Sequence, residues 1–517
     1  MRATPILALL ALSACSSYEN SMYADAADSG WAGAWDDTSS SEYDPNDDGD
    51  GTDLGSETED DFLKLSPTAT QAYVFVVNSS RNTVSRISVP SLDVLTTEVG
   101  VDPQVATTTS DYSRAVVFNA GSDSISVIDA ETMESTEVEI RSNFNNMLLS
   151  PDGRWALVYN DADLPTEGST GALQSFNEIS LVNVETLEHL SMAVGFHPRE
   201  ATFTPDSSEL LIVANEWMAS LDLEAEDIRP QLVELAEDPL NAPVAEEVLV
   251  EPTGAFAFVR QFGEDRLVVV DLAEHTLQRV DIGYNPTDLD LSPDGTKAVV
   301  VSRGSQELHV LNAQDPLAEQ EVIALPADEV IGSLHFSPDG SKAVLYTTAQ
   351  REARYTTWDV DSGELKVRSL VKPVKSVSVS PTGGTLLVFH TLEDDADTPS
   401  TSPYFGEHAL TMIDLDSFLA NPLLIPDEPS AFANSSDGEF GYFIMEGIPA
   451  LAVLQYDNLL FEEVTLRSDP VHVGVLPEST YAYVNQEHEL GRLSFYEPET
   501  QALQTITGFE LNSGIKH

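Results

Sequence analysis

The sequence predicts an all-β protein built from about ten four-stranded repeats. A short turn sequence recurs from Ser66 onward at spacings of 40 to 55 residues. The intervals between these turns hold short runs rich in β-branched residues, and no segment other than 221–237 has helical periodicity. A period of this size is typical of repeat architectures in which each unit packs against its neighbours.

The recurring turn reads Ser-Pro-Asp-Gly at 150–153, 292–295 and 337–340. Pro presets φ, Asp bonds its own backbone and Gly accepts a positive φ, so this sequence favours a tight turn. Degenerate copies begin at Ser66, Ser110, Thr204, Glu251, Ser380, Ser435 and Leu476.

One repeat shows how the strands follow the turn. After the turn at 292–295 come strand-like runs at 297–302, 307–312, 319–326 and 331–337, the last of which leads into the next turn. Each repeat is therefore a meander of strands A, B, C and D, with the turn between A and B. Such a sheet buries both faces only between two neighbours, which predicts a β-propeller. We favour one large ring over two smaller rings, with closure placing residues 62–66 beside residues 481–509.

The repeats resemble a known family. Residues 72–85 (AYVFVVNSSRNTVS) and 115–130 (AVVFNAGSDSISVIDA) are similar to the YVTN family of β-propeller repeats. The resemblance covers roughly residues 62–517 and implies a propeller that is often secreted or surface-exposed. It implies no fixed catalytic residues.

The N-terminus indicates export and lipid attachment. Residues 1–14 carry one Arg and a short apolar run, too short to span a bilayer as a helix, which indicates a signal peptide. The ending Leu-Ser-Ala-Cys resembles the lipobox of bacterial lipoproteins. That resemblance implies cleavage before Cys15, lipidation of Cys15 and a location anchored in the outer membrane, facing the periplasm or the cell surface.

Residues 15–61 form an acidic segment that we expect to be a disordered tether. Residues 16–61 contain 15 Asp or Glu and no Lys or Arg. Such a composition buries too little apolar surface to offset chain entropy. Part of it matches the first half of a calcium loop, through the side chains of Asp44, Asn46, Asp48 and Asp50. Gly55 stands where the loop needs a bidentate Glu, so Ca²⁺ is a weak candidate, and no other cofactor is predicted.

The charge of the chain excludes one class of function. With 24 Lys and Arg against 87 Asp and Glu, the formal net charge is −63. A nucleic-acid binder that neutralises phosphates needs a basic surface, so nucleic acid is excluded as a partner. From residue 62 onward 72 acidic and 23 basic residues still give −49. Two explanations for this acidity compete: adaptation to a salty habitat, or binding of divalent cations or of a cationic partner.

A second motif locates a candidate ligand site. Pro occurs just before the expected strand A at Pro103, Pro198, Pro286, Pro373, Pro429 and Pro470. The residues that follow should rim one end of the central channel, on the face that carries the D–A and B–C loops, which we call the rim face. The candidate rim residues are Gln104, Arg199, Glu200, Thr287, Asp288, Lys375 and His472.

The two longest repeats add to the same face. Their extra residues, 161–177 and 391–407, lie between strands B and C. Binding loops gather on one face of such scaffolds. The sequence therefore favours a lipid-anchored envelope propeller that binds a protein, glycan or other envelope component, or scaffolds an assembly, without catalysis. The alternative is a lactonase-like hydrolase or lyase with its site at the channel mouth.

Overall fold

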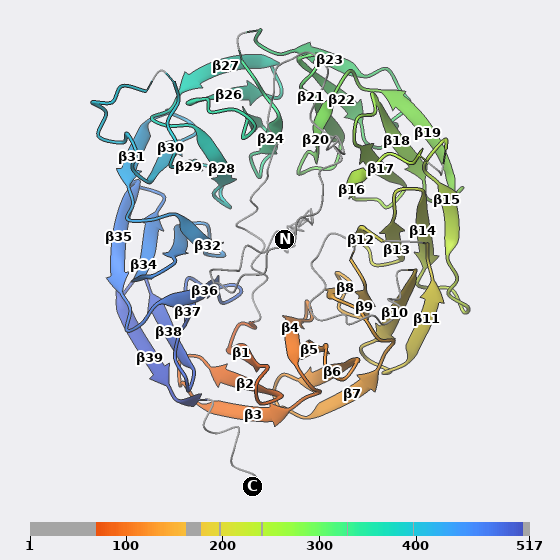
Figure 1. Cartoon of the computed structure of the whole chain (residues 1–517), viewed down its shortest axis with the longest axis vertical. Coiled ribbons are helices and arrows are strands. Elements are labelled where there is room, and N and C mark those ends of the chain that lie inside the picture. The colour runs from red at the N-terminus through yellow and green to blue at the C-terminus, as the bar shows by residue number, and fades with distance from the viewer. Residues whose placement is uncertain are drawn as a thin grey trace, which may run out of the picture.

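The computed structural model forms one ring of ten sheets, as Figure 1 shows. It describes residues 69–161, 177–195, 198–238, 241–327, 329–396 and 398–509. Nine sheets have four antiparallel strands, and the first has three within the described residues. This confirms the predicted single ring of ten blades. The signal peptide, Cys15, the tether and the candidate calcium residues Asp44, Asn46, Asp48 and Asp50 lie outside the described residues.

The strands are numbered along the chain, and each blade runs outward from the centre of the ring. The innermost strands are β4 Pro103–Thr108, β8 Asn146–Leu149, β12 Glu200–Phe203, β16 Ala245–Val250, β20 Pro286–Leu291, β24 Ser333–Phe336, β28 Val374–Val379, β32 Pro429–Asn434 and β36 Pro470–Val475. The second strands are β1 Tyr73–Asn78, β5 Arg114–Asn119, β9 Trp155–Tyr159, β13 Glu209–Val213, β17 Phe256–Gln261, β21 Lys297–Ser302, β25 Lys342–Tyr346, β29 Thr385–His390, β33 Phe440–Met445 and β37 Ala482–Gln486. The third strands are β2 Thr83–Ser88, β6 Ser124–Asp129, β10 Glu178–Asn183, β14 Trp217–Asp222, β18 Arg266–Asp271, β22 Glu307–Asn312, β26 Arg354–Asp359, β30 Ala409–Asp414, β34 Ile448–Gln455 and β38 Arg492–Glu497. The outermost strands are β3 Val94–Glu98, β7 Ser135–Glu139, β11 His189–Ala193, β15 Gln231–Glu234, β19 Thr276–Asp281, β23 Glu321–Ala324, β27 Glu364–Ser369, β31 Ala420–Leu424, β35 Leu460–Thr465 and β39 Ala502–Thr507.

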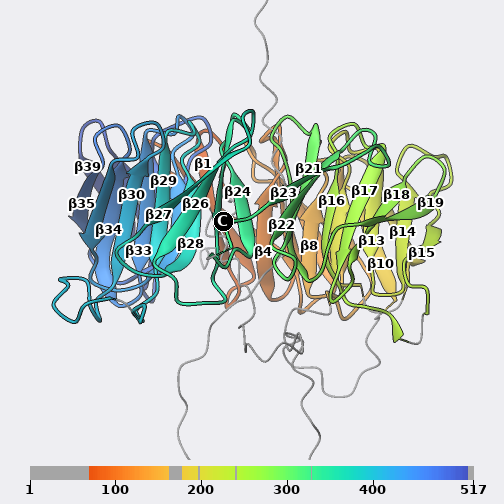
Figure 2. The ribbon, with the colours of Figure 1, turned by 90° about the horizontal axis from the view of Figure 1, so that it is seen from above.

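Every blade is an up-and-down meander, so its loops fall on two opposite faces, as the side view in Figure 2 shows. The D–A and B–C connections share the rim face, and the A–B and C–D connections share the other, which we call the turn face. The weak helical pattern at 221–237 was misleading, because this segment contains the end of β14 and all of β15. Within the described ranges, no helix has the length and apolar character needed to cross a membrane.

The core is divided among the blade junctions. Ten apolar clusters of buried side chains each join two neighbouring blades. One of them closes the ring, because Val74 and Ile87 of blade 1 pack with Leu493 and Phe495 of blade 10. Residues 62–66, which we expected at this closure, lie outside the described residues.

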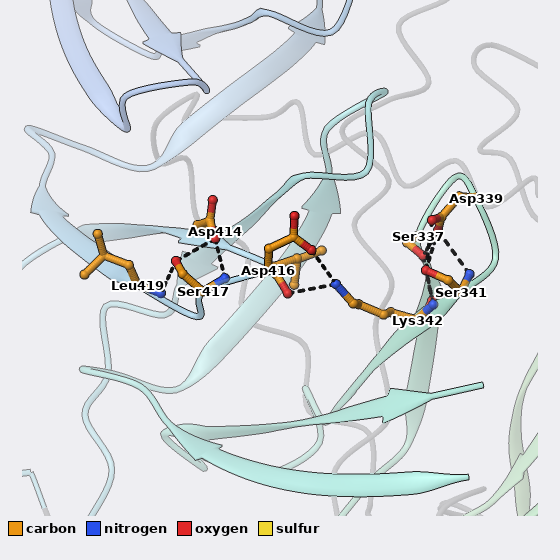
Figure 3. A network of polar contacts seen from close by, with 9 residues as sticks. Ser337, Asp339, Ser341, Lys342, Asp414, Asp416, Ser417 and Leu419 are labelled. Atoms are coloured by element: carbon orange, nitrogen blue, oxygen red, sulfur yellow. Dashed lines mark hydrogen bonds and ion pairs between the residues drawn. The ribbon is translucent and has the colours of Figure 1, made fainter. Parts of the chain in front are cut away.

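The A–B turns have the geometry that their sequence predicts. In blade 7, Asp339 Oδ1 accepts hydrogen bonds from Ser337 Oγ at 2.6 Å and from Ser341 N at 3.0 Å, as Figure 3 shows. Gly340 follows with a φ of 69°. Lys342 then donates to Asp416 Oδ1 at 2.9 Å, which links this turn to the C–D turn of blade 8.

Neighbouring A–B turns also pack on one another. A Cβ atom on Gly295 would lie 2.1 Å from Pro252 Cγ of the preceding blade. A Cβ atom on Gly340 would meet Pro293 Cδ at 3.4 Å. The Pro of one turn therefore faces the Gly of the next, so the repeated motif serves the blade junctions as well as the turn itself.

Candidate functional site

The innermost strands begin with a β-bulge in six blades. In β20, for example, the register shifts between Pro286 and Asp288, so Thr287 is the extra residue. Pro has no N–H to donate to the neighbouring strand, but this is tolerated at the first residue of a strand or at a bulge. A bulge redirects side chains, and bulges are frequent next to binding sites. The extra residues of the six bulges are Gln104, Glu246, Thr287, Lys375, Ser430 and Val471.

The structure distributes the candidate rim residues around the ring. They lie at or next to the starts of β4, β12, β20, β28 and β36, which belong to blades 2, 4, 6, 8 and 10. All of them therefore lie on the rim face at the inner edge of the ring. Because these blades alternate with others, the candidates from different strands belong to separate, non-adjacent blades.

Three candidates join one blade to the next. Thr287 Oγ1 donates to the carbonyl of Gly332 at 2.6 Å, and Asp288 accepts from the backbone N of Leu334 at 2.5 Å. Asp288 is buried. Lys375 pairs with the carboxylate of Glu428, which precedes β32. These polar groups therefore stabilise blade junctions in addition to lying on the rim face.

Two further candidates, Gln104 and His472, contact residues of their own blade or of the loop before it. Gln104 is exposed, and its amide donates to Asp102 Oδ2 at 3.2 Å. The His472 ring stacks on Tyr483, with ring centroids 6.1 Å apart. Burial lowers the pKa of His472, which favours a neutral ring.

Arg199 and Glu200 lie at the start of β12, beside a polar cluster of blade 3. Burial raises the pKa of the Tyr159 hydroxyl well above its ordinary value, and the carboxylates of Asp161 and Glu200 add to this shift. Asp161 Oδ2 accepts from Asn146 Nδ2 at 3.2 Å and from Tyr159 OH at 3.3 Å. Sequence analysis missed this cluster because blade 3 lacks the Pro signal.

A second feature that sequence analysis missed is a buried charge network at the start of β16. Arg260 pairs with Glu246 and, at 3.0 Å, with Glu247 Oε2. It also donates to the carbonyl of Pro286 at 3.3 Å. Burial alone would lower the pKa of Arg260, but Glu247 and Glu246 outweigh it and hold the pKa above its ordinary value. Pro243, two residues before β16, was the available signal.

A buried lysine, Lys372, holds the insertion of blade 8 in place through hydrogen bonds and an ion pair. Lys372 is fully buried and lies in the D–A loop before β28. Its Nζ donates to the carbonyls of Leu392 at 2.8 Å and Tyr404 at 3.1 Å, and it pairs with Asp394 Oδ1 at 3.0 Å. The other carboxylate oxygen of Asp394 accepts from Gly406 N at 2.8 Å.

The fastened loop leaves apolar side chains in solvent. The loop spans residues 391–407 and projects beside β31 in Figure 1. Leu392 is 47% exposed and Phe405 is 45% exposed. The other insertion lies outside the described residues from 162 to 176.

The described residues hold no group of three or more His, Cys, Asp or Glu side chains arranged to bind a metal ion. The calcium candidates of the tether lie outside those ranges. Ca²⁺ binding at Asp44, Asn46, Asp48 and Asp50 stays a prediction.

Comparisons with known proteins add little beyond the fold. No family model and no curated protein matches the chain, so the resemblance to YVTN repeats stays a prediction. A similar solved structure is dihydro-heme d1 dehydrogenase NirN in complex with DHE, at 12% identity and a TM-score of 0.45, covering 80% of this chain and 81% of that chain. Another is apo AztD from Citrobacter koseri, at 12% identity and a TM-score of 0.37, covering 58% and 83%. The Cps50 (Swd1) β-propeller domain of Myceliophteria thermophila has 12% identity and a TM-score of 0.33, covering 62% and 95%.

These similarities are too low to carry an argument about function. The topology of the sheets itself defines the class: the protein is a ten-bladed β-propeller.

Proposed function

We propose that this propeller is an envelope lipoprotein, anchored in the outer membrane by a lipid on Cys15, and that its rim face binds a protein, glycan or other envelope component without catalysis. The anchor rests on the residues before Cys15, which resemble a lipobox. The binding role rests on the blade 8 insertion.

The observation that carries the proposal is the way in which Lys372 holds this insertion. Burying a lysine is costly unless its charge and its donors are satisfied. Here two carbonyls and the Asp394 carboxylate satisfy it, and all three belong to residues 391–407. A loop fixed in advance loses less entropy when a partner binds. Leu392 and Phe405 are therefore presented as apolar contacts on a rigid support.

Site-specific crosslinking tests the binding role. A photoreactive amino acid replaces Leu392 or Phe405 in cells, and matched variants carry it at Leu317 or Leu419, which are 52% and 64% exposed on the turn face. We expect one discrete adduct from the rim positions and none from the turn positions. Equal crosslinking from both faces, or none from either, would contradict the proposal.

A second variant tests the role of the fastened loop. Lys372→Met removes the charge under residues 391–407, and Lys366→Met removes a lysine whose pair with Glu364 is exposed. We expect the adduct at Phe405 to be lost with the first change and retained with the second. A folding check by circular dichroism separates a loosened loop from an unfolded protein.

The anchor has its own test. Cys15→Ala should prevent lipid attachment and leave the precursor unprocessed, so the variant should incorporate no labelled fatty acid and keep the larger precursor size. Wild-type protein under the same labelling is the control. A variant that still incorporates the label, or that is processed to the mature size, would disprove the lipid anchor and leave the binding role untouched.

A further inference from the structure

A pocket of about 160 Å³ lies on the rim face where blade 4 meets blade 5. It is formed by residues 236–238 and 241–243, which follow β15, by the B–C loop after β17 and by the first residue of β18, with Arg279 of β19 beside them. We call it the blade 4–5 pocket. Its described lining residues are Ala236, Glu237, Asp238, Asn241, Pro243, Gln261, Glu264, Arg266 and Arg279.

Two guanidinium groups converge in this pocket. Arg266 Nη1 lies 3.2 Å and Arg279 Nε lies 3.7 Å from the same atom, Glu237 Oε1. Arg279 is also fixed by a hydrogen bond from Nη2 to the carbonyl of Leu235 at 2.5 Å. The chain has only 24 Lys and Arg, so a pair of arginines around one pocket is a notable use of scarce positive charge.

A buried amide in the same pocket has a donor without an acceptor. Gln261 is 3% exposed, and its Nε2 has no hydrogen-bond partner among the described residues. Leaving a buried donor unsatisfied costs its full desolvation penalty. An acceptor that enters the pocket would remove this cost, so Gln261 and the arginines together indicate a ligand that carries a carboxylate or similar anion.

The rim of the pocket supplies acceptors. Asp238 and Glu264 line it, and Asn241 Nδ2 donates to Asp238 Oδ2 at 2.7 Å. Carboxylate oxygens next to an arginine pair suit a ligand that has hydroxyl groups beside its own carboxylate. The volume is of the size of one sugar ring.

The Glu237 side chain occupies the position that such a ligand would take. It is 63% exposed, accepts a hydrogen bond from Arg266 and forms an ion pair with Arg279. An ion pair whose carboxylate is exposed contributes little net stability, so a ligand carboxylate can displace Glu237.

We propose that the blade 4–5 pocket binds the carboxylate of a hexuronic acid, alone or as one residue of a glycan, in place of the Glu237 side chain. The inference deepens the proposed function, on which it rests, because it names an acidic sugar as the ligand of the rim face. Arg266, Arg279 and Gln261 would hold the carboxylate, and Asp238 and Glu264 would accept from the hydroxyl groups.

Titration calorimetry of the full chain with galacturonic acid tests the proposal, with galactose and glutamate as comparison ligands. We expect galacturonic acid to bind and galactose not to bind, because only the former has the carboxylate. Binding of glutamate without binding of galacturonic acid, or equal binding of galactose, would overturn the proposal.

Three variants make the result specific. Arg279→Gln should weaken binding of galacturonic acid at least tenfold. Gln261→Met should weaken it about tenfold without lowering the melting temperature, since the amide donor has no partner in the free protein. Glu237→Gln should strengthen it severalfold, because it removes the carboxylate that pairs with both arginines, while Glu264 and Asp265 still lie 3.8 Å from Arg266.

A matched control is Arg229→Gln, which removes an exposed arginine paired with Asp227 in the C–D connection on the turn face. It should leave affinity unchanged. Weaker binding in Glu237→Gln, or unchanged binding in both Arg279→Gln and Gln261→Met, would refute the site. The crosslinking at Leu392 and Phe405 is independent of this pocket, so the two proposals can fail separately.

Discussion

His390 shows how one residue couples the fold to pH. It ends β29, directly before the blade 8 insertion, and is 4% exposed. Its Nδ1 lies 3.1 Å from the carbonyl of Pro373, and its Nε2 lies 2.7 Å from Thr411 Oγ1. A carbonyl can only accept, so Nδ1 carries the proton and the neutral ring accepts from Thr411 through Nε2. Burial, with a smaller contribution from the nearby Lys372 charge, lowers the pKa of His390 to about 4.

This shift predicts a loss of stability in mild acid. The ordinary pKa of histidine is about 6.5, so between pH 6.5 and 4 the unfolded chain binds a proton that the folded chain does not. The free energy of unfolding therefore falls as the pH falls through this range, by about 3 kcal/mol in total. We expect the melting temperature of the wild type to drop more between pH 7 and 4.5 than that of His390→Gln.

The control for this measurement is His488→Gln, which changes an exposed histidine in a B–C loop. It should follow the wild-type pH profile, because the buried His390 is retained. The carboxylates that titrate in the same pH range are common to all three proteins and therefore cancel in the comparison. Parallel profiles for wild type and His390→Gln would contradict the assigned cause.

At the scale of elements, the A–B turns are the units that repeat most faithfully. The turns at 292–295 and 337–340 each form internal hydrogen bonds and also pack on the turn of the preceding blade. Gly295 combines both demands, with a φ of 65° and no space for a Cβ atom next to Pro252. Gly363 has a φ of 71° but nothing within 4 Å of its Cβ position.

This pair predicts two different costs. Gly363→Ala should lower the free energy of unfolding by about 1 kcal/mol, which is the cost of a left-handed backbone. Gly295→Ala adds a clash with Pro252 and should cost about 1–3 kcal/mol more. Chemical denaturation of both variants measures the difference. Equal losses would show that the turns do not pack as described.

These elements also show how far the sequence could predict the structure. The turn spacing predicted the ten blades, and the Pro before strand A located most of the inner strand starts. These sequence patterns could not predict the close packing of Pro252 on Gly295, because the relative position of two blades depends on contacts between residues far apart in the sequence. They also could not predict that Thr287 and Asp288 bond to blade 7, or that Arg260 balances Glu246 and Glu247. Those pairs join residues whose proximity depends on bulges and blade angles.

At the scale of the whole molecule, ring closure rests on noncovalent contacts within the described residues. Blade 1 and blade 10 share an apolar cluster, and Gln71 Nε2 donates to Glu478 Oε2 at 2.6 Å across 407 positions of sequence. The closing junction is therefore built like the nine others. Its stability must withstand the repulsion of a very acidic surface.

That repulsion leads to a prediction about salt. From residue 62 onward the net charge is −49, so the folded ring is destabilised by its own charge, and salt screens this repulsion. We expect the melting temperature to rise steadily between 0.1 and 1 M NaCl, over which the Debye length falls from about 10 Å to about 3 Å.

The turn carboxylates are already engaged, since Asp294 accepts from Ser292 Oγ and Thr296 N. CaCl₂ should therefore act on the folded ring only through ionic strength, and NaCl of equal ionic strength should raise the melting temperature as much. A larger effect of millimolar Ca²⁺ would show a specific site, and replacing Asp44, Asn46, Asp48 and Asp50 by Ser would then decide whether that site lies in the tether.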